Sequence, residues 1–233
     1  MIEPGARSAA DERVRSGHRR LVLQPPCKGL RVGFDDDLAR FDWPRIKTYL
    51  GHADLVPHAV RRLAVASDDK EAARLGAWME RALLSVAGPC EGCALVATVL
   101  VAALPGMTPS GRSVALDLLS QISAAEVIGP AHEQIGTVDV EEIRQTVATG
   151  FPYYVSVLRA ESSPEADLNS CIDLMNVLAF HDRRFVAEAI AALKAVRSAG
   201  RAPHLAVLIN NTIDDLAYPS NNSAPRDSTL PPG

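Results

Sequence analysis

The chain has 233 residues, of which 47% are hydrophobic and only 5% aromatic, and its formal net charge is −4 at pH 7. Ala, Leu and Val dominate, which favours packed helices over a strand-rich or aromatic-lined fold. Residues 1–31 hold seven Arg and Lys against three acidic residues, so the rest, with 17 basic and 25 acidic residues, carries −8. This acidic balance argues against nucleic acid as the main partner, because phosphate binding requires clustered basic side chains.

Helix-period patterns follow one another from Trp43 to Ala217, with no convincing strand alternation between them. Residues 1–34 lack this periodicity and are rich in Arg, Gly, Pro and Ser, so we expect a disordered basic arm there. Residues 218–233 contain several Pro and Asn and predict a disordered tail. The helical domain is therefore expected over residues 35–217.

Capping residues and breakers divide this domain into about ten helices. Asp42 is expected to cap the first helix and Ser67-Asp68-Asp69 the third, and Asp139 is expected to start the helix that follows a longer loop at 128–138. The expected helices cover residues 43–51, 55–65, 69–88, 90–104, 110–123, 139–148, 153–159, 165–180, 182–200 and 203–216.

Each expected helix has one apolar stripe, which it cannot bury alone. The pattern is clear in one helix, where the apolar positions are Leu168, Cys171, Ile172, Met175 and Leu178. Stacking neighbouring helices would bury these stripes in a continuous core, and helix pairs of about 35 to 45 residues match the spacing of HEAT or armadillo units. The sequence therefore predicts an all-α fold, an α-solenoid of stacked antiparallel helix pairs.

The cellular location is expected to be the cytoplasm. The longest early apolar run is only Leu21 to Leu23, too short for a signal peptide. Four cysteines, two of them within helix patterns, suit a reducing compartment better than a disulfide framework. Residues 92–111 are uncharged and raise a membrane alternative, but Leu104-Pro105-Gly106 interrupts the apolar run, which favours a buried core helix.

Several short motifs of this chain resemble bacterial HEAT-like repeat proteins that are common in actinomycetes. They are Asp42-Trp43 with Tyr49-Leu50-Gly51, Asp54-Leu55-Val56-Pro57, Gly92 with Ala97-Thr98 and Leu104-Pro105, and Val147-Ala148-Thr149-Gly150-Phe151-Pro152. The resemblance covers about two thirds of the chain, and its motifs concern packing. It implies an interaction scaffold, with regulatory or immunity partners of toxins among the roles.

Cys90-Glu91-Gly92-Cys93 is the sharpest local motif. Its two thiols share one turn at an expected helix start, where the free backbone amides and the helix dipole favour a thiolate at Cys90. This geometry suits a redox or metal-binding role. A structural zinc needs four ligands, and the chain has no second pair with ligand spacing. We therefore interpret Cys90 and Cys93 mainly as small core residues and predict no cofactor and no metal.

The few aromatic residues are candidates for an interface. Trp43, Tyr49 and Trp78 are expected to anchor the N-terminal end, although one of them could stand exposed and bind a partner. Tyr153 and Tyr154 are adjacent and must point to different sides of a helix, so we expect one hydroxyl to remain in water and face a partner.

Other polar residues give no catalytic pattern. The six histidines are scattered and are interpreted as surface or capping residues, Arg183 and Arg184 as a solvated helix face, and Ser113 as a helix surface or cap.

Three functions remain open. The first is a non-catalytic scaffold or regulatory partner that binds a protein, with a toxin-immunity role among the candidates. The second is an enzyme that uses the groove of the stack on a nucleic acid or a small molecule, for which the sequence shows no convergent polar set. The third is a thiol redox or metal sensor at Cys90 and Cys93. The first agrees best with a stack that leaves a long exposed surface.

Overall fold

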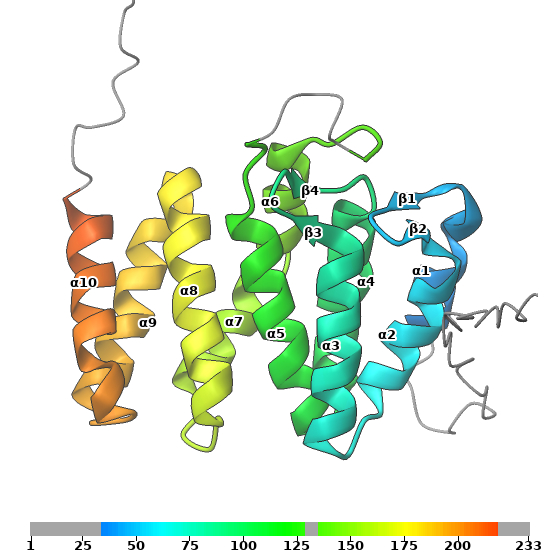
Figure 1. Cartoon of the computed structure of the whole chain (residues 1–233). Helices are drawn as coiled ribbons and strands as arrows, with labels where there is room; N and C mark the ends of the chain where they lie inside the picture. Colours follow the sequence, from blue (N-terminus) through cyan, green and yellow to red (C-terminus); the bar gives the residue numbers. More distant parts are fainter. Residues whose placement is uncertain (1–33, 129–134, 219–233) are drawn as a thin grey trace, which may run out of the picture.

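The computed structural model describes residues 34–128 and 135–218 of the chain. Helices dominate in these ranges, so the predicted all-α class is confirmed. The α-helices in the described ranges are α1 (Phe34–Ala39), α2 (Val56–Ala64), α3 (Asp69–Leu83), α4 (Cys93–Ala103), α5 (Pro109–Ala124), α6 (Val140–Ala148), α7 (Phe151–Arg159), α8 (Glu165–His181), α9 (Val186–Ser198) and α10 (Ala206–Ala217) (Figure 1).

Short 3-10 helices and two small hairpins connect the α-helices. The 3-10 helices are η1 (Trp43–Arg45), η2 (Ala53–Leu55), η3 (Leu104–Gly106), η5 (Arg183–Phe185) and η6 (Pro203–Leu205). Each hairpin pairs two antiparallel strands of two residues each. They are β1 (Lys47–Thr48) with β2 (Gly51–His52), and β3 (Leu84–Ser85) with β4 (Gly88–Pro89).

The ordered helices begin earlier than the sequence pattern indicates. Phe34, which the sequence assigns to the predicted arm, starts α1 and is only 4% exposed. The six residues of α1 are too few to reveal a helical period. Residues 1–33 and 219–233, which make up almost all of the predicted arm and tail, lie outside the described residues.

The predicted helix over residues 43–51 is wrong. It stops after the single turn of η1, because Ile46 is extended (φ −79°, ψ 131°) and leads into the β1–β2 hairpin. Gly51 has φ of +108°, which suits glycine and lets the chain reverse within the hairpin instead of ending a helix. Asp42 makes no capping hydrogen bond through its side chain.

The helix predicted over residues 69–88 ends at Leu83, where the chain turns into the β3–β4 hairpin. Gly88 has φ of +120°, and a Cβ atom there would lie 2.5 Å from the backbone oxygen of Glu126. Gly88 therefore shapes the hairpin and does not stop α3. A strand of two residues carries too little alternation to appear in a sequence pattern.

Two predicted helix starts are confirmed by their caps. Asp68 accepts a hydrogen bond from the backbone N–H of Lys70 at 3.0 Å, and α3 follows. Asp139 accepts from the backbone N–H groups of Glu141 and Glu142 at 2.9 and 3.1 Å, and α6 follows. These caps satisfy amides that the helix itself leaves free.

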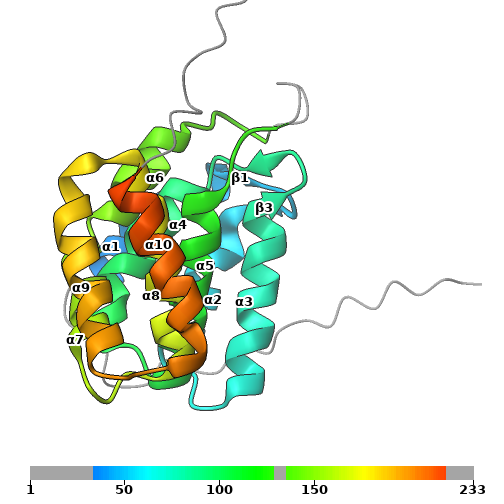
Figure 2. The same ribbon diagram turned by 90° about the vertical axis from the view of Figure 1, so that its left-hand side faces the viewer.

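The helices form two layers (Figures 1 and 2). In one layer, α3 packs on α5, α5 on α8, and α8 on α10. In the other layer, α1 packs on α4, α4 on α6, and α7 on α9. Contacts of α4 with α5, α7 with α8, and α9 with α10 join the layers. Elements that are close in sequence are therefore neighbours along the array.

One continuous apolar core runs between the layers from Phe34 to Leu216. The uncharged segment at 92–111 contributes α4, which lies in this core against α1, α2, α5 and α6. Among the described residues, no helix combines the length and hydrophobicity required to span a bilayer. The predicted stripe on α8, from Leu168 to Leu178, is buried at each of its five positions.

Candidate functional site

Trp43 and Tyr49 support the N-terminal end of the array. The Trp43 indole is buried, and its Nε1–H donates to the Leu38 carbonyl oxygen at 2.6 Å. Tyr49 is partly buried, and its hydroxyl donates to the Gly88 carbonyl oxygen at 3.1 Å, which connects the two hairpins. Both polar groups are bonded to backbone, so these two aromatic residues anchor this end of the fold.

Tyr153 and Tyr154 differ from their predicted arrangement. Tyr154 is fully buried, and its hydroxyl donates to the Val147 carbonyl oxygen at 3.0 Å. Tyr153 is partly buried, and its hydroxyl donates to the Leu104 carbonyl oxygen at 3.3 Å. Tyr154 is therefore excluded as a residue that faces a partner, and Tyr153 is the more accessible of the two.

Cys90 and Cys93 lie in the core, and both side chains have no exposed surface. Cys93 Sγ is 3.3 Å from the Leu83 carbonyl oxygen, and Cys90 Sγ is 3.7 Å from that of Ala82. The Ala82 oxygen also accepts from the backbone N–H of Tyr49 at 2.9 Å. The motif therefore packs the start of α4 against the end of α3 and the first hairpin.

The interaction between the two thiols lowers the pKa of Cys90 and raises the pKa of Cys93, and burial adds to the increase at Cys93. Glu91 between them is partly exposed, and its backbone N–H donates to the Ile135 carbonyl oxygen at 2.9 Å. The described residues contain no group of three or more His, Cys, Asp and Glu side chains that could hold a metal ion. Within the described residues, the two thiols therefore have no third side chain close enough to share a metal ion with them.

Burial predicts that these thiols are unreactive in the folded protein. In a Cys27→Ser variant, the remaining cysteines are Cys90, Cys93 and Cys171, all of them buried. We expect Ellman's reagent to label none of the three within minutes in buffer and all three in guanidinium chloride. Rapid labelling of two thiols in buffer that disappears in a Cys90→Ala/Cys93→Ala background would show instead that the motif is accessible.

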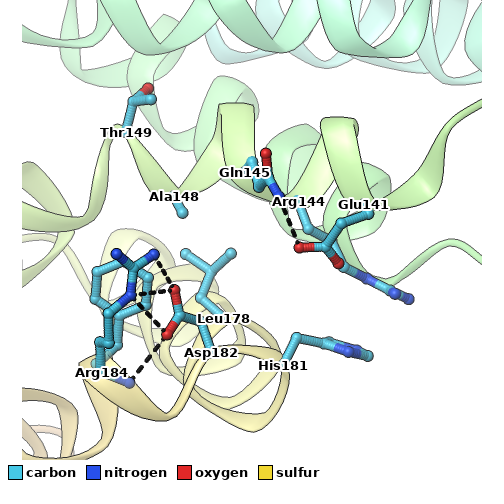
Figure 3. Close-up of a pocket in the computed structure, with 10 residues that line it drawn as sticks. Glu141, Arg144, Gln145, Ala148, Thr149, Leu178, His181, Asp182 and Arg184 are labelled. Carbon is cyan, nitrogen blue, oxygen red and sulfur yellow. Dashed lines mark hydrogen bonds and ion pairs between the residues drawn. The ribbon is translucent and has the colours of Figure 1, made fainter.

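A cleft of about 420 Å³ lies between α6 and the junction of α8, η5 and α9 (Figure 3). Its apolar surface comes from Ala148, Leu178 and Phe185. The Phe185 ring is stacked on Phe151, with centroids 4.3 Å apart, and this contact fixes one wall. The polar lining residues are Glu141, Arg144, Gln145, Thr149, His181, Asp182 and Arg184.

Both arginines of the cleft have carboxylate partners. Arg184 is paired with Asp182, with Nη2 and Oδ2 separated by 2.6 Å. Asp182 also accepts from the backbone N–H of Arg184, and these two hydrogen bonds lower the pKa of the Asp182 carboxyl. Arg144 is only 13% exposed and bonds to Glu126 Oε1 at 3.1 Å and to the Ser123 carbonyl oxygen at 3.3 Å.

An exposed aromatic residue lies beside the cleft. Phe180 is 53% exposed and meets His181 edge-on, with ring centroids 5.3 Å apart. Partial burial and the nearby Arg144 lower the pKa of His181, although Glu126 and Glu141 oppose this effect. His181 is therefore neutral at pH 7. Together, Phe180 and the cleft present an amphipathic surface on the outside of the helical array.

A buried polar cluster lies between α5 and α8. Asp167 has no exposed surface, and its carboxylate accepts from Arg112 Nε at 2.7 Å and from the Ser113 hydroxyl. Tyr153 is next to Arg112, and burial raises the pKa of its hydroxyl. Ser113, which the sequence assigns to a helix surface or cap, is partly exposed, and its hydroxyl donates to Asp167 across the helix interface. Asp167 is inaccessible to a substrate, so this cluster holds helices together.

None of the candidate interaction or redox residues predicted from the sequence lines the cleft. Cys90, Glu91 and Cys93 lie near Tyr49, whereas Tyr153 and Tyr154 belong to α7. The cleft residues include His181, which the sequence assigns to a surface or cap, and Arg184, which it assigns to a solvated helix face. They share the cleft because α6, which packs on α4 and α5, lies opposite the end of α8, and no motif in the chain signals this arrangement.

No protein-family model matches this sequence, and neither curated protein sequences nor solved structures show a significant match to it.

Proposed function

We propose that this protein is a non-catalytic scaffold of HEAT-like, α-solenoid type, which binds a protein partner at the cleft between α6 and the α8–α9 junction. The observation that carries this proposal is the composition of the cleft. It combines an apolar floor with charged residues whose arginines already have carboxylate partners, and it adjoins the exposed Phe180 ring. Such mixed surfaces with an aromatic residue are typical of protein interfaces.

The helical array supports the solenoid part of the proposal. Helices that are close in the chain pack as neighbours, and the core extends along the whole array. In a solenoid, each unit contacts mainly the adjacent units, and the outer surfaces remain available for a partner.

The pairing of charges supports binding over catalysis. A general acid or base needs a side chain that can exchange a proton with a substrate. In the cleft, Asp182 is held ionised by Arg184, and Arg144 is held by Glu126. His181 is the one imidazole in the lining, and no hydrogen bond joins it to a carboxylate within the described part of the chain.

The cytoplasm is the compartment that we propose for this scaffold. Cys90, Cys93 and Cys171 are all free thiols, which agrees with a reducing environment.

The test is a comparison of three immobilised proteins in native lysate of the source cells. The cleft variant is Phe180→Ala/Arg184→Ala, and the matched control is Val207→Ala/Lys194→Ala, which removes one exposed apolar and one exposed basic side chain elsewhere. Quantitative mass spectrometry should find a protein that the wild type and the control enrich equally and that the cleft variant enriches at least about tenfold less, as expected when an aromatic and an arginine contact are lost together.

Two results would contradict the proposal. In the first, the same proteins are enriched by all three samples, which would place binding elsewhere. In the second, the wild type enriches nothing above bare resin after chemical crosslinking. Circular dichroism of both variants shows whether folding is intact.

A further inference from the structure

Among the residues that the structure describes, Glu141 is the charged residue of the cleft that forms no ion pair. Its carboxylate accepts a hydrogen bond from Gln145 Nε2 at 3.0 Å, one turn further along α6. No salt bridge to it is formed within residues 34–128 and 135–218, whereas Asp182, Arg144 and Arg184 all have partners of opposite charge. The unbalanced charge in the lining is therefore negative.

The surroundings reinforce this negative character. His181 ends α8 at the cleft, so the negative end of that helix dipole lies there. His181 itself is neutral at pH 7 because its pKa is lowered. The described residues as a whole contain 16 Lys and Arg against 23 Asp and Glu, a balance of −7. A basic group approaching this face is attracted at long range as well as in the cleft.

The dimensions and floor of the cleft suit a long side chain. A volume of about 420 Å³ admits a few residues of a polypeptide and excludes a folded domain. Ala148, Leu178 and Phe185 offer apolar surface on which the methylene groups of Lys or Arg can lie, while the charged head reaches a carboxylate at the rim. Phe185 is preorganised for this role by its stacking on Phe151.

We propose that the cleft receives a basic side chain, Lys or Arg, from an extended segment of the protein partner, with Glu141 as its counter-ion. This inference rests on the proposed function and names the chemistry of the partner. The paired residues Asp182–Arg184 and Glu126–Arg144 border the site and keep it from attracting acidic segments, because their charges already cancel.

The experiment uses the full chain and three nonapeptides that carry Lys, Gln or Glu at three alternate positions among Ala and Gly. Binding is followed by chemical-shift changes of backbone amides in isotope-labelled protein. The Lys peptide should bind most tightly and shift the amides of Gln145, Ala148 and Leu178. Glu141→Gln should weaken it by about threefold to fivefold, the range for a partly exposed ion pair.

The matched control is Glu142→Gln. Glu142 is the next residue in the same first turn of α6, is exposed, and does not line the cleft. Both substitutions remove one charge from the same helix end, so their effects on net charge are equal. Glu142→Gln should therefore leave the affinity for the Lys peptide within experimental error.

Three outcomes would overturn the inference. Equal weakening by Glu141→Gln and Glu142→Gln would indicate only general attraction to an acidic surface. Equal binding of the Lys and Gln peptides in the cleft would remove the preference for a basic side chain but leave the proposed scaffold function standing. If no peptide shifts the cleft amides at millimolar concentration, both the inference and the proposed binding site fail.

Discussion

Replacing Asp167 by alanine is expected to lower the free energy of unfolding by about 3 kcal/mol, because a buried ion pair loses one partner. The Asp167 side chain is 1% exposed and that of Arg112 is 23% exposed, so the guanidinium remains largely buried when its counter-ion is removed. The Ser113 hydroxyl loses its acceptor as well. Urea unfolding followed by circular dichroism measures the change.

Asp35→Ala is the control for this prediction. Asp35 also lies in the first turn of its helix and pairs with an arginine, Arg61, at 2.7 Å. Its side chain is 67% exposed and that of Arg61 is 42% exposed, so we expect a loss below about 1 kcal/mol. If the two variants lose equal stability, the cluster at Asp167 does not fasten α5 to α8 as the geometry indicates.

Gly111→Ala is expected to destabilise the fold by about 2 to 3 kcal/mol through overpacking. A Cβ atom at Gly111 would lie 2.0 Å from the Leu63 backbone oxygen. That oxygen cannot swing aside as a side chain could, because it accepts from the backbone N–H of Ala66 at the end of α2. A second contact also holds the start of α5 against the end of α2, since the backbone N–H of Thr108 donates to the Ala64 carbonyl oxygen at 3.0 Å.

Gly106→Ala is the matched control, because nothing lies within 4 Å of a Cβ atom at Gly106 and its φ is not in the left-handed region. Its unfolding free energy should change by less than about 0.5 kcal/mol. Thermal and urea unfolding of the two variants give the comparison. A Gly111→Ala protein as stable as the control would mean that α2 and α5 separate more easily than their packing implies.

The buried cluster contributes to the stability of the fold, whereas the cleft contributes to the proposed binding, so different residues determine the two properties. Asp167 and Gly111 act inside the array, where they hold α5 against α8 and α2. The cleft is built from the outer parts of α6 and of the α8–α9 junction, and Glu141 is exposed there. Substitutions at Glu141 should therefore alter binding with little effect on folding, which makes the two properties separable by experiment.

Local patterns in the chain predicted the helices well where caps and periodicity are strong. Asp68 and Asp139 cap the helices that follow them, and the stripe from Leu168 to Leu178 is buried. The prediction is wrong at residues 43–51, which form a turn and a hairpin because a short strand pair depends on a partner strand and on glycine torsion angles.

The candidate site was not predictable in the same way. The sequence predicts that Tyr153 or Tyr154 keeps its hydroxyl in water, yet the Tyr153 hydroxyl bonds to the carbonyl group of Leu104, which only the packed helices bring within reach. Arg144 and Glu126 do not belong to the same helix, so no i,i+3 or i,i+4 spacing predicts their contact. Their ion pair forms only because α6 folds back beside the end of α5.

The sequence alone determined that this protein is built from amphipathic helices, because a helix and its caps are encoded within a few consecutive residues. The tertiary structure alone decided which polar groups form buried hydrogen bonds and ion pairs with one another, and where a cleft remains between the helices. Those outcomes depend on distances between segments tens of residues apart, and the free energy of an ion pair or an unfilled volume is set by the surroundings that packing creates.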